Sequence, residues 1–498
     1  MGPKSIWVGT SQEGKTNPAF QGNASADVVI IGAGISGITA AMLLSKAGLK
    51  VIVLEAMKVG MGTTGYSTGN LYSTVDENLS YIRSKWNEEV MMKVVQSRRA
   101  AMNLIESNIS KYQIDCDFVH VPMHFYAETT TPETELFFDK EFDALEQCGL
   151  MPQFVSQGLP FSTHKMMTIP GQAQFHPLKY VLKLAEELPE NCSVFEDSKV
   201  ISIDEENGIV ETDLGTVTAN SIIMATHVPK GVYPIHTVLG PYREFAVAAE
   251  LKDDSLADGV FWDVGEPKHS VRVYRDGGKN YVMVLSDKFK TGHHGDSSEY
   301  VNEIENYLRS RFNIGEMNYL WGGQHYRPAD GLPYIGQYSG KIHILTGFST
   351  SGLVYGTLGA MILSDKILGL TNPYADMYDA NRHTPIKSFK DFIKENVDNA
   401  IQLIKDFPSQ GDIEALSEIQ PGEGRVVDHD GHKLAIYRGE DGQTQIVSAV
   451  CTHMKCIVHF NAAETSWDCP CHGSRFKTNG EVIEGPAIDA LPSKQFLN

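Results

Sequence analysis

Two short cysteine–histidine boxes near the end of the chain constrain its fold more than any other feature. Cys-Thr-His-Met-Lys-Cys occupies positions 451–456, and Cys-Pro-Cys-His-Gly-Ser occupies positions 469–474. Cys-x-His and Cys-x-x-His spacings supply thiolates and imidazoles, which are the usual soft metal ligands of proteins. Four of the seven cysteines lie in these boxes, and such clustering in a 498-residue chain favours a metal site over a disulfide framework. The C-terminal segment must therefore fold so that two loops meet at one metal centre.

The two boxes allow two interpretations. The expected ligands are Cys451, His453, Cys469 and His472. Two cysteines and two histidines form the ligand set of a Rieske 2Fe–2S centre, with the cysteines on one iron and the histidines on the other. A structural zinc ion with the same four ligands is the alternative. Zinc leaves the second cysteine of each box and the Gly-Pro-Ala at 485–487 without a role, so we expect the iron–sulfur cluster.

A second motif lies near the N-terminus. Gly-Ala-Gly-Ile-Ser-Gly at 32–37 follows an apolar run that predicts a buried strand from Asp27, and it opens a predicted helix that ends near Lys46. A second predicted strand ends at Glu55. In this βαβ setting the glycines let the backbone approach a pyrophosphate at the helix N-terminus, and the acidic residue accepts hydrogen bonds from ribose hydroxyls. A glycine-rich turn without a ligand is the alternative, and the complete context disfavours it.

Later segments predict a second kind of sheet. Residues from Arg243, Ser270 and Asn280 alternate between apolar and polar, as expected for antiparallel strands with one covered face. Helices are predicted near 88–111, 298–312 and 352–368, and another near 387–405 after a Pro- and Asn-rich exit at 372–385. A small β-rich module begins near residue 413.

Residues 25–370 resemble a known family. The segments that carry the resemblance are the glycine motif, Gly60–Asn70 (GMGTTGYSTGN), Ser221–His227 (SIIMATH), Leu332–Gly336 (LPYIG) and Thr346–Thr357 (TGFSTSGLVYGT). They look like the D-amino-acid-oxidase-like family of FAD oxidoreductases, with glycine- and glutamylputrescine-oxidase-like members nearest in pattern. His227 is a departure, because the family often has glycine after Ala-Thr.

The resemblance implies an α/β FAD-binding doubly wound domain interleaved with an α+β antiparallel-sheet substrate domain, plus a small all-β Rieske domain. The implied division is an N-terminal extension (1–24), the oxidoreductase (25–370), a linker with a connecting helix (371–411) and the Rieske domain (412–498). The FAD-binding parts are about 25–75, 165–235 and 320–370, and the substrate parts are about 76–164 and 236–319. The implied FAD contacts are Gly32, Ala33, Gly34, Ile35, Ser36, Gly37, Glu55, Ala56, Thr63, Thr64, Ser67, Thr68, Val200, Ala225, Thr226, Gly347, Phe348, Gly352 and Leu353.

In this family the substrate is usually oxidised by hydride transfer to the flavin, so the protein mainly positions the substrate. The positioning candidates are His176, Arg243, Arg272, His325 and Arg327. Each could equally serve a structural salt bridge or a core hydrogen bond. Arg272 and Arg327 are the expected carboxylate-binding pair, because a guanidinium can bind a carboxylate with two hydrogen bonds.

The C-terminal boxes resemble Rieske domains of the cytochrome bc complex type. That resemblance implies a disulfide between Cys456 and Cys471 and a proline loop at 485–487 over the cluster. The bc type commonly places a serine and a tyrosine hydroxyl near the cluster; here Ser474 is present, but Phe476 replaces the tyrosine. Because hydrogen bonds to the sulfurs raise the potential, we expect a potential below that of quinol-oxidising Rieske proteins.

The whole chain is similar to bacterial FAD oxidoreductases with a fused Rieske domain. The function expected first is oxidation of a small-molecule amine or amino acid, with electrons leaving through the cluster to an external acceptor, either a protein or a quinone. One alternative reverses the flow, from an external donor through the cluster to FAD for reduction or oxygen activation. Another makes the Rieske module a redox sensor or a structural brace.

Charge and hydropathy exclude other classes of function. The formal net charge of −20 argues against nucleic-acid binding, which requires a basic surface. The longest apolar stretch, Val28–Leu44, is interrupted by the glycine motif, so we do not expect an integral membrane protein. The N-terminus lacks the apolar region of a signal peptide, and a cytoplasmic location is expected.

Overall fold

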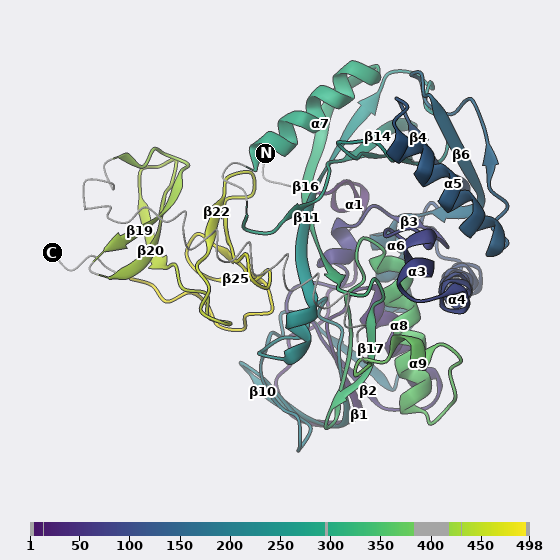
Figure 1. Ribbon diagram of the computed structural model, residues 1–498. Coiled ribbons are helices and arrows are strands. Elements are labelled where there is room, and N and C mark those ends of the chain that lie inside the picture. Colours follow the sequence, from purple (N-terminus) through teal and green to yellow (C-terminus); the bar gives the residue numbers. More distant parts are fainter. Residues whose placement is uncertain (1–3, 13, 294–296, 383–417, 430, 495–498) are drawn as a thin grey trace.

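The structure is a computed structural model that describes residues 4–12, 14–293, 297–382, 418–429 and 431–494 (Figure 1). One sheet has the strand order β17-β18-β10-β1-β2-β7. Its strands are β1 (Gly22–Ile31), β2 (Val51–Leu54), β7 (Cys192–Phe195), β10 (Gly215–Met224), β17 (Tyr334–Ser339) and β18 (Ile342–Thr346), with β8 (Val200–Asp204) and β9 (Ile209–Thr212) joined through β10. All pairs along this order are parallel except β17 with β18.

Helices cover this parallel sheet. α2 (Ile35–Lys46) packs against α8 (Gly352–Ile367), which also contacts α4 (Glu88–Tyr112). The strand segments Val28–Ile31 and Val51–Leu54 are buried at every position, as expected for strands that are covered on both faces. The glycine motif lies where β1 passes into α2, at the carboxyl edge of the sheet, where ligands bind in such folds.

A second, antiparallel-rich sheet has the order β15-β11-β14-β13-β12-β4-β6-β3, with β16 on β11 and β5 on β6. Its strands are β3 (Asn70–Leu71), β4 (Val119–Ala127), β5 (Gln153–Phe154), β6 (Lys165–Gln174), β11 (Leu239–Leu251), β12 (Val260–Asp263), β13 (Ser270–Asp276), β14 (Lys279–Leu285), β15 (Phe289–Lys290) and β16 (Ile314–Pro328). β11 and β16 pair along nearly their whole length, and Figure 1 shows this long pair between the body of the molecule and the C-terminal module.

The remaining helices lie around these two sheets. They are α1 (Ile6–Thr10), α3 (Leu79–Lys85), α5 (Pro132–Gln147), α6 (Pro177–Glu186), α7 (Ser298–Arg311) and α9 (Ala375–Tyr378), with the short 3₁₀ turns η1 (Thr63–Tyr66) and η2 (Pro234–Val238). None of the helices in the described ranges combines the length and apolarity that a membrane crossing requires.

The C-terminal module (residues 418–429 and 431–494) contains two small antiparallel sheets. One has β19 (Gly424–His429), β20 (His432–Arg438) and β21 (Thr444–Ser448), and the other has β22 (His459–Asn461), β23 (Ser466–Asp468), β24 (Arg475–Lys477) and β25 (Val482–Glu484). The core of the module includes the fully buried Trp467 and Phe476 together with Cys451 and Cys469. The first Cys–His box lies between β21 and β22, and the second lies between β23 and β24.

The expected fold class is confirmed: a doubly wound α/β domain, an interleaved antiparallel-sheet domain and a small all-β module. The predicted helices near 88–111, 298–312 and 352–368 correspond to α4, α7 and α8. The helix expected at 387–405 and the expected start of the module at 412 lie outside the described residues, so these boundaries stay predictions.

Candidate functional site

A cavity of about 970 Å³ opens at the carboxyl edge of the parallel sheet. Its walls come from three places: the β1–α2 turn and the segment after β2, the antiparallel sheet, and the C-terminal module. The module contributes Glu464, Arg475, Lys477, Val482, Ile483, Glu484, Ala487 and Ile488. The cavity is therefore bounded by both halves of the chain.

The β1–α2 turn leaves room for a backbone-bound anion. Gly32 has a φ of 104°, and a Cβ there would lie 2.5 Å from the carbonyl oxygen of Ala225. A Cβ on Gly37 would lie 1.9 Å from the carbonyl oxygen of Gly32, so only glycine permits this tight turn. The N-cap residue Gly34 has no side chain that could cap α2, and the N–H of Ile35 donates to the Thr64 hydroxyl at 3.0 Å. Gly34 and Ile35 line the cavity, so the positive end of the helix faces the space in which a phosphate could bind.

Glu55 lies at the tip of β2 and faces the same cavity. Its carboxylate accepts hydrogen bonds from the backbone N–H of Ala33 (2.7 Å) and of Met57 (2.9 Å). Burial raises the pKa of this carboxyl, although both backbone bonds oppose the shift. These bonds fix the carboxylate at the start of the α2 turn, where a ribose hydroxyl could bind it.

Most of the expected FAD contacts line this cavity; Ala33, Gly37 and Gly347 are the members of the set that do not. None of the lysines in the wall was anticipated from the sequence, and three of them, Lys58, Lys199 and Lys230, lie near the expected FAD contacts. Burial lowers the pKa of Lys230 to about 8. No motif marks these lysines, but all three lie in segments flanking the expected contacts, where cations would face a pyrophosphate.

Of the five substrate-positioning candidates, Arg243 and His325 line the cavity. Arg243, on β11, is 1% exposed, and its Nη2 donates to Glu464 at 2.6 Å. Its Nε and Nη1 are buried and have no hydrogen-bond partner among the described residues. His325 stacks on Tyr242, and burial lowers its pKa to about 3, so its imidazole is neutral at pH 7.

The other three candidates are placed outside the cavity wall as the described residues define it. His176 caps α6 by accepting a hydrogen bond from the N–H of Lys179 at 3.1 Å. Arg272 donates to the carbonyl oxygen of Thr68 and packs over the Trp7 ring. Arg327 forms two hydrogen bonds of 2.7 Å with Glu77. The guanidinium of Arg327 is thus occupied by Glu77, whereas Arg272 uses Nη1 within the protein, and its Nε is buried without a hydrogen-bond partner among the described residues.

Acidic groups in the cavity were not anticipated. Asp76 pairs with Lys288 at 3.5 Å, and although burial opposes ionisation, the charges of Lys288 and Arg327 lower its pKa to about 2. Glu244 also faces the cavity. Burial and the nearby charge of Asp76 raise the pKa of Glu244 to about 8, so it is a neutral acid at pH 7.

The two Cys–His boxes meet at the tip of the module. The rings of His453 and His472 lie 4.9 Å apart, and the Nδ1 atoms of both are buried without a hydrogen-bond partner in the described structure. Cys451 and Cys469 are buried, and a hydrogen bond from the Cys469 thiol is the main cause that lowers the pKa of Cys451 to about 7. Two orphaned imidazole nitrogens beside two adjoining thiols fit the donor set of a 2Fe–2S cluster.

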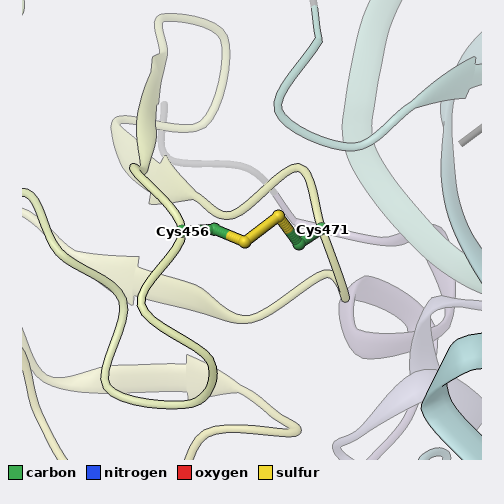
Figure 2. Close-up of a disulfide and its surroundings, with 2 residues drawn as sticks. All are labelled: Cys456 and Cys471. Atoms are coloured by element: carbon green, nitrogen blue, oxygen red, sulfur yellow. A yellow bond between two sulfur atoms is a disulfide. The ribbon is translucent and has the colours of Figure 1, made fainter. Parts of the chain in front are cut away.

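The expected disulfide is present between Cys456 and Cys471 (Figure 2). It joins the two cluster loops across 15 residues of sequence. Because both sulfurs are consumed in this bond, neither can be a thiolate ligand. The Ser474 hydroxyl hydrogen-bonds with Cys451 and accepts from the N–H of Ala487 at 3.0 Å, whereas Phe476 is fully buried and offers no hydroxyl.

Comparison with known families decides the classification. The family described as FAD dependent oxidoreductase (DAO) matches residues 27–366, and the Rieske [2Fe-2S] domain matches residues 410–495. The chain belongs to the DAO family. Its DAO domain binds FAD and its Rieske domain, the C-terminal module described above, binds a 2Fe–2S cluster. It is an FAD-dependent oxidoreductase of the amine and amino-acid oxidase type.

Relatives of two kinds support this classification. The Rieske 2Fe-2S iron-sulfur protein YhfW of Bacillus subtilis is 28% identical over 500 residues, which cover 98% of this chain and 97% of that protein. Gamma-glutamylputrescine oxidoreductase of Escherichia coli is 22% identical over 379 residues, which cover 72% of this chain and 87% of that protein. Glycine oxidase from Geobacillus kaustophilus has the same fold, with a TM-score of 0.60, 18% identity, and coverage of 73% of this chain and all of that one.

The Rieske domain turns its histidines toward the DAO domain. A ring nitrogen of His453 (Nε2) lies 3.1 Å from the carbonyl oxygen of Gly231, in the loop after β10. As a donor to this carbonyl, Nε2 leaves Nδ1 as the free ligand atom. The buried His236 from the same loop packs edge-on to His453 at 4.9 Å. The face of the Rieske domain that carries His453 and His472 is therefore packed against the domain that binds FAD.

Proposed function

We propose that this protein oxidises an amine or an amino acid at FAD and passes the electrons through its Rieske cluster to an external protein or quinone. The observation that carries the proposal is the shared cavity. Rieske residues such as Glu464 and Glu484 form part of the wall around the FAD site, and His453 contacts Gly231 in the loop that follows the expected flavin contacts. A Rieske domain in this place is suited to electron exchange with the flavin.

The bound flavin supplies the hydride acceptor for oxidation of the substrate α-carbon. The residues of the chain position the substrate and exclude water from it. Arg243 replaces Arg272 and Arg327 as the proposed carboxylate-binding residue, because two of its buried donors are unpaired and it lines the cavity. An acceptor group of the substrate would satisfy donors that are costly to leave unpaired.

We assign the cluster ligands to Cys451, His453, Cys469 and His472, as the motif predicts. The buried thiols and the two unpartnered Nδ1 atoms support this assignment. A hydride carries two electrons, whereas a 2Fe–2S cluster holds one, so two deliveries to the acceptor complete each turnover. The cytoplasmic location expected from the N-terminal sequence stays a prediction.

The test is an anaerobic screen of amines and amino acids in which flavin bleaching and the EPR signal of the reduced cluster are followed together. The proposal expects bleaching by at least one amine, followed by the cluster signal. The Cys451→Ser variant serves as the control that should bleach without giving this signal. Flavin reduction that never reaches the cluster would favour a structural brace. Reduction of both centres by an external reductant alone would favour the reversed flow.

A further inference from the structure

His227 occupies a position at which its backbone favours glycine. Its φ is 69°, in the left-handed region that non-glycine residues adopt uncommonly, Asn, Asp and His more often than the others. It is also the residue at which the sequence departs from the Ala-Thr-Gly pattern of the family. The case for a role of His227 therefore rests on the contacts of its side chain.

The side chain of His227 lies between the two domains. Its Nδ1 is 2.9 Å from the Glu484 carboxylate of the Rieske domain and 3.3 Å from the Thr63 hydroxyl, an expected flavin contact. His227 lines the FAD cavity, and the Thr346 hydroxyl donates to its carbonyl oxygen at 2.7 Å. As a donor, Nδ1 binds the Glu484 carboxylate on the cluster side, with the Thr63 oxygen on the flavin side as a second, longer contact of the same N–H.

Tyr326 continues the contact toward the cluster. Its ring packs edge-on against His227, with centroids 4.9 Å apart and an interplanar angle of 73°. Its hydroxyl oxygen lies 3.0 Å from the carbonyl oxygen of Gly485 and 3.3 Å from that of His472, and it can donate to one of them at a time. Gln324 fixes the hydroxyl by donating to it at 3.0 Å and to the carbonyl oxygen of Gly473 at 2.8 Å.

We propose that the His227–Tyr326 pair is the route by which electrons cross between the FAD site and the Rieske cluster. The inference rests on the proposed function only in that the two centres exchange electrons; either direction of flow satisfies it. In the forward direction each crossing removes one electron from the reduced flavin and adds one to the oxidised cluster, with no bond made or broken. An external one-electron acceptor empties the cluster before the next crossing.

The backbone offers a second possible path for electrons between the two centres, so the variants must distinguish it from a path through the His227 side chain. The backbone from His227 to Gly231 leads to the His453 contact over a span of at most roughly 14 Å when fully extended. A route along this backbone would survive loss of the His227 side chain. His227 could also act only by holding the Rieske domain in place through Glu484.

Two substitutions at position 227 separate these roles. His227→Gly removes both the bond to Glu484 and the ring, and it restores the family pattern and the favoured backbone. His227→Asn tolerates the same φ, and its amide reaches the position of Nδ1, so it can keep the bond to Glu484 while removing the ring that packs on Tyr326. His120→Asn, at an exposed site on β4, is the matched control.

The experiment reduces the flavin of the intact holoprotein by a light flash, with a sacrificial electron donor that is not an amine in place of the substrate, and follows the transfer of electrons to the cluster. We expect both variants at position 227 to lose the fast phase of cluster reduction, while His120→Asn keeps it. The EPR spectrum and the reduction potential of the cluster should stay unchanged in all three. Because the flash needs no amine, a failure of the proposed substrate chemistry would leave this result intact.

Two outcomes would overturn the route. A fast phase of wild-type rate in His227→Asn would show that the ring is dispensable. A shifted EPR spectrum or potential in both variants would show that His227 acts on the cluster environment and not on the path. Tyr326→Leu provides the second arm: loss of the fast phase there, with an unchanged spectrum, supports the route, and a wild-type rate contradicts it.

Discussion

The Glu464 carboxylate of the Rieske domain accepts hydrogen bonds from the Arg243 guanidinium of the DAO domain, and both groups are buried. The side chains are 1% and 10% exposed for Arg243 and Glu464. Arg475 pairs with the same carboxylate at 3.1 Å, and Asn461 donates to it at 3.1 Å. The Rieske domain therefore fixes a cation in the wall of the FAD cavity, so the shape of the cavity depends on the presence of that domain.

Replacement of Arg243 by glutamine should weaken the binding of ligands that carry a carboxylate. Loss of charge-assisted hydrogen bonds worth about 1.5–3 kcal/mol corresponds to a roughly 10- to 100-fold higher dissociation constant. The measurement is a titration of the flavin absorbance spectrum with a carboxylate ligand, and an amine of similar size that lacks the carboxylate is the control. Equal weakening of both ligands would mean that the variant perturbs the cavity as a whole.

Replacement of Phe476 by tyrosine should raise the reduction potential of the cluster. Phe476 is fully buried beside Cys451 and Cys469 in the module core, and a hydroxyl there could add one hydrogen bond to a sulfur. One hydrogen bond is worth about 1 kcal/mol, which is roughly 40 mV for a one-electron couple. A redox titration followed by EPR measures the change, with Ser474→Ala as the opposite case that should lower the potential. If the wild-type cluster had a potential as high as that of quinol-oxidising Rieske proteins, the interpretation that Phe476 lowers the potential would be wrong.

The sequence predicted those parts of the structure that depend on local geometry. The turn at Gly32 and the position of Glu55 follow from a strand, a tight turn and a helix in succession, and the disulfide was implied by the resemblance of the two boxes to bc-type Rieske domains. The hydrogen-bond partners of the arginines could not be predicted from local geometry. Arg272 and Arg327 find their partners in Thr68 and Glu77, about 200 and 250 residues away in sequence.

The contacts between the two domains could not be predicted from the sequence either. His227 could be recognised as a departure from the family pattern, but its partner Glu484 lies 257 residues later. Likewise, His176 has the residue type of a substrate-binding group, yet it serves as a helix cap. Such assignments depend on how distant surfaces pack together, and local periodicity carries no information about that packing.

Removal of the disulfide by the paired substitution of Cys456 and Cys471 with serine should make the cluster more labile. Closing a loop of about 15 residues stabilises a fold by roughly 3 kcal/mol through the entropy of the unfolded chain, and here the bond ties the last residue of the first box to the second box. We expect the iron content to fall on mild heating before the flavin is lost. Paired measurements of iron and flavin against temperature test this. If the variant lost iron and flavin at the same temperatures as the wild-type protein, the disulfide would not protect the cluster.

Glu244 should make carboxylate binding depend on pH near 8. Burial, aided by the charge of Asp76, raises its pKa to about 8, while Lys288 and Arg327 oppose the shift and Asp287 adds to it. Below pH 8 the acid is neutral in the folded protein, and above pH 8 it adds a negative charge to the cavity. Two like charges about 10 Å apart at an effective dielectric constant of about 20 repel by roughly 1.7 kcal/mol, which is on the order of tenfold in affinity.

The raised pKa of Glu244 also makes the stability of the folded protein depend on pH. Between the ordinary carboxyl pKa of about 4.5 and the raised value of about 8, the folded state retains a proton that the unfolded state has released. Stability from this group is therefore complete below pH 4.5 and declines as the pH rises toward 8. The Glu244→Gln variant, which cannot ionise, should lack this decline. Its binding of a carboxylate ligand without amine groups should weaken less between pH 7 and pH 9 than that of the wild-type protein; the dependence that is left comes from Lys230, which also lines the cavity and has a pKa of about 8. An identical pH dependence in the two proteins would assign the titration to another group.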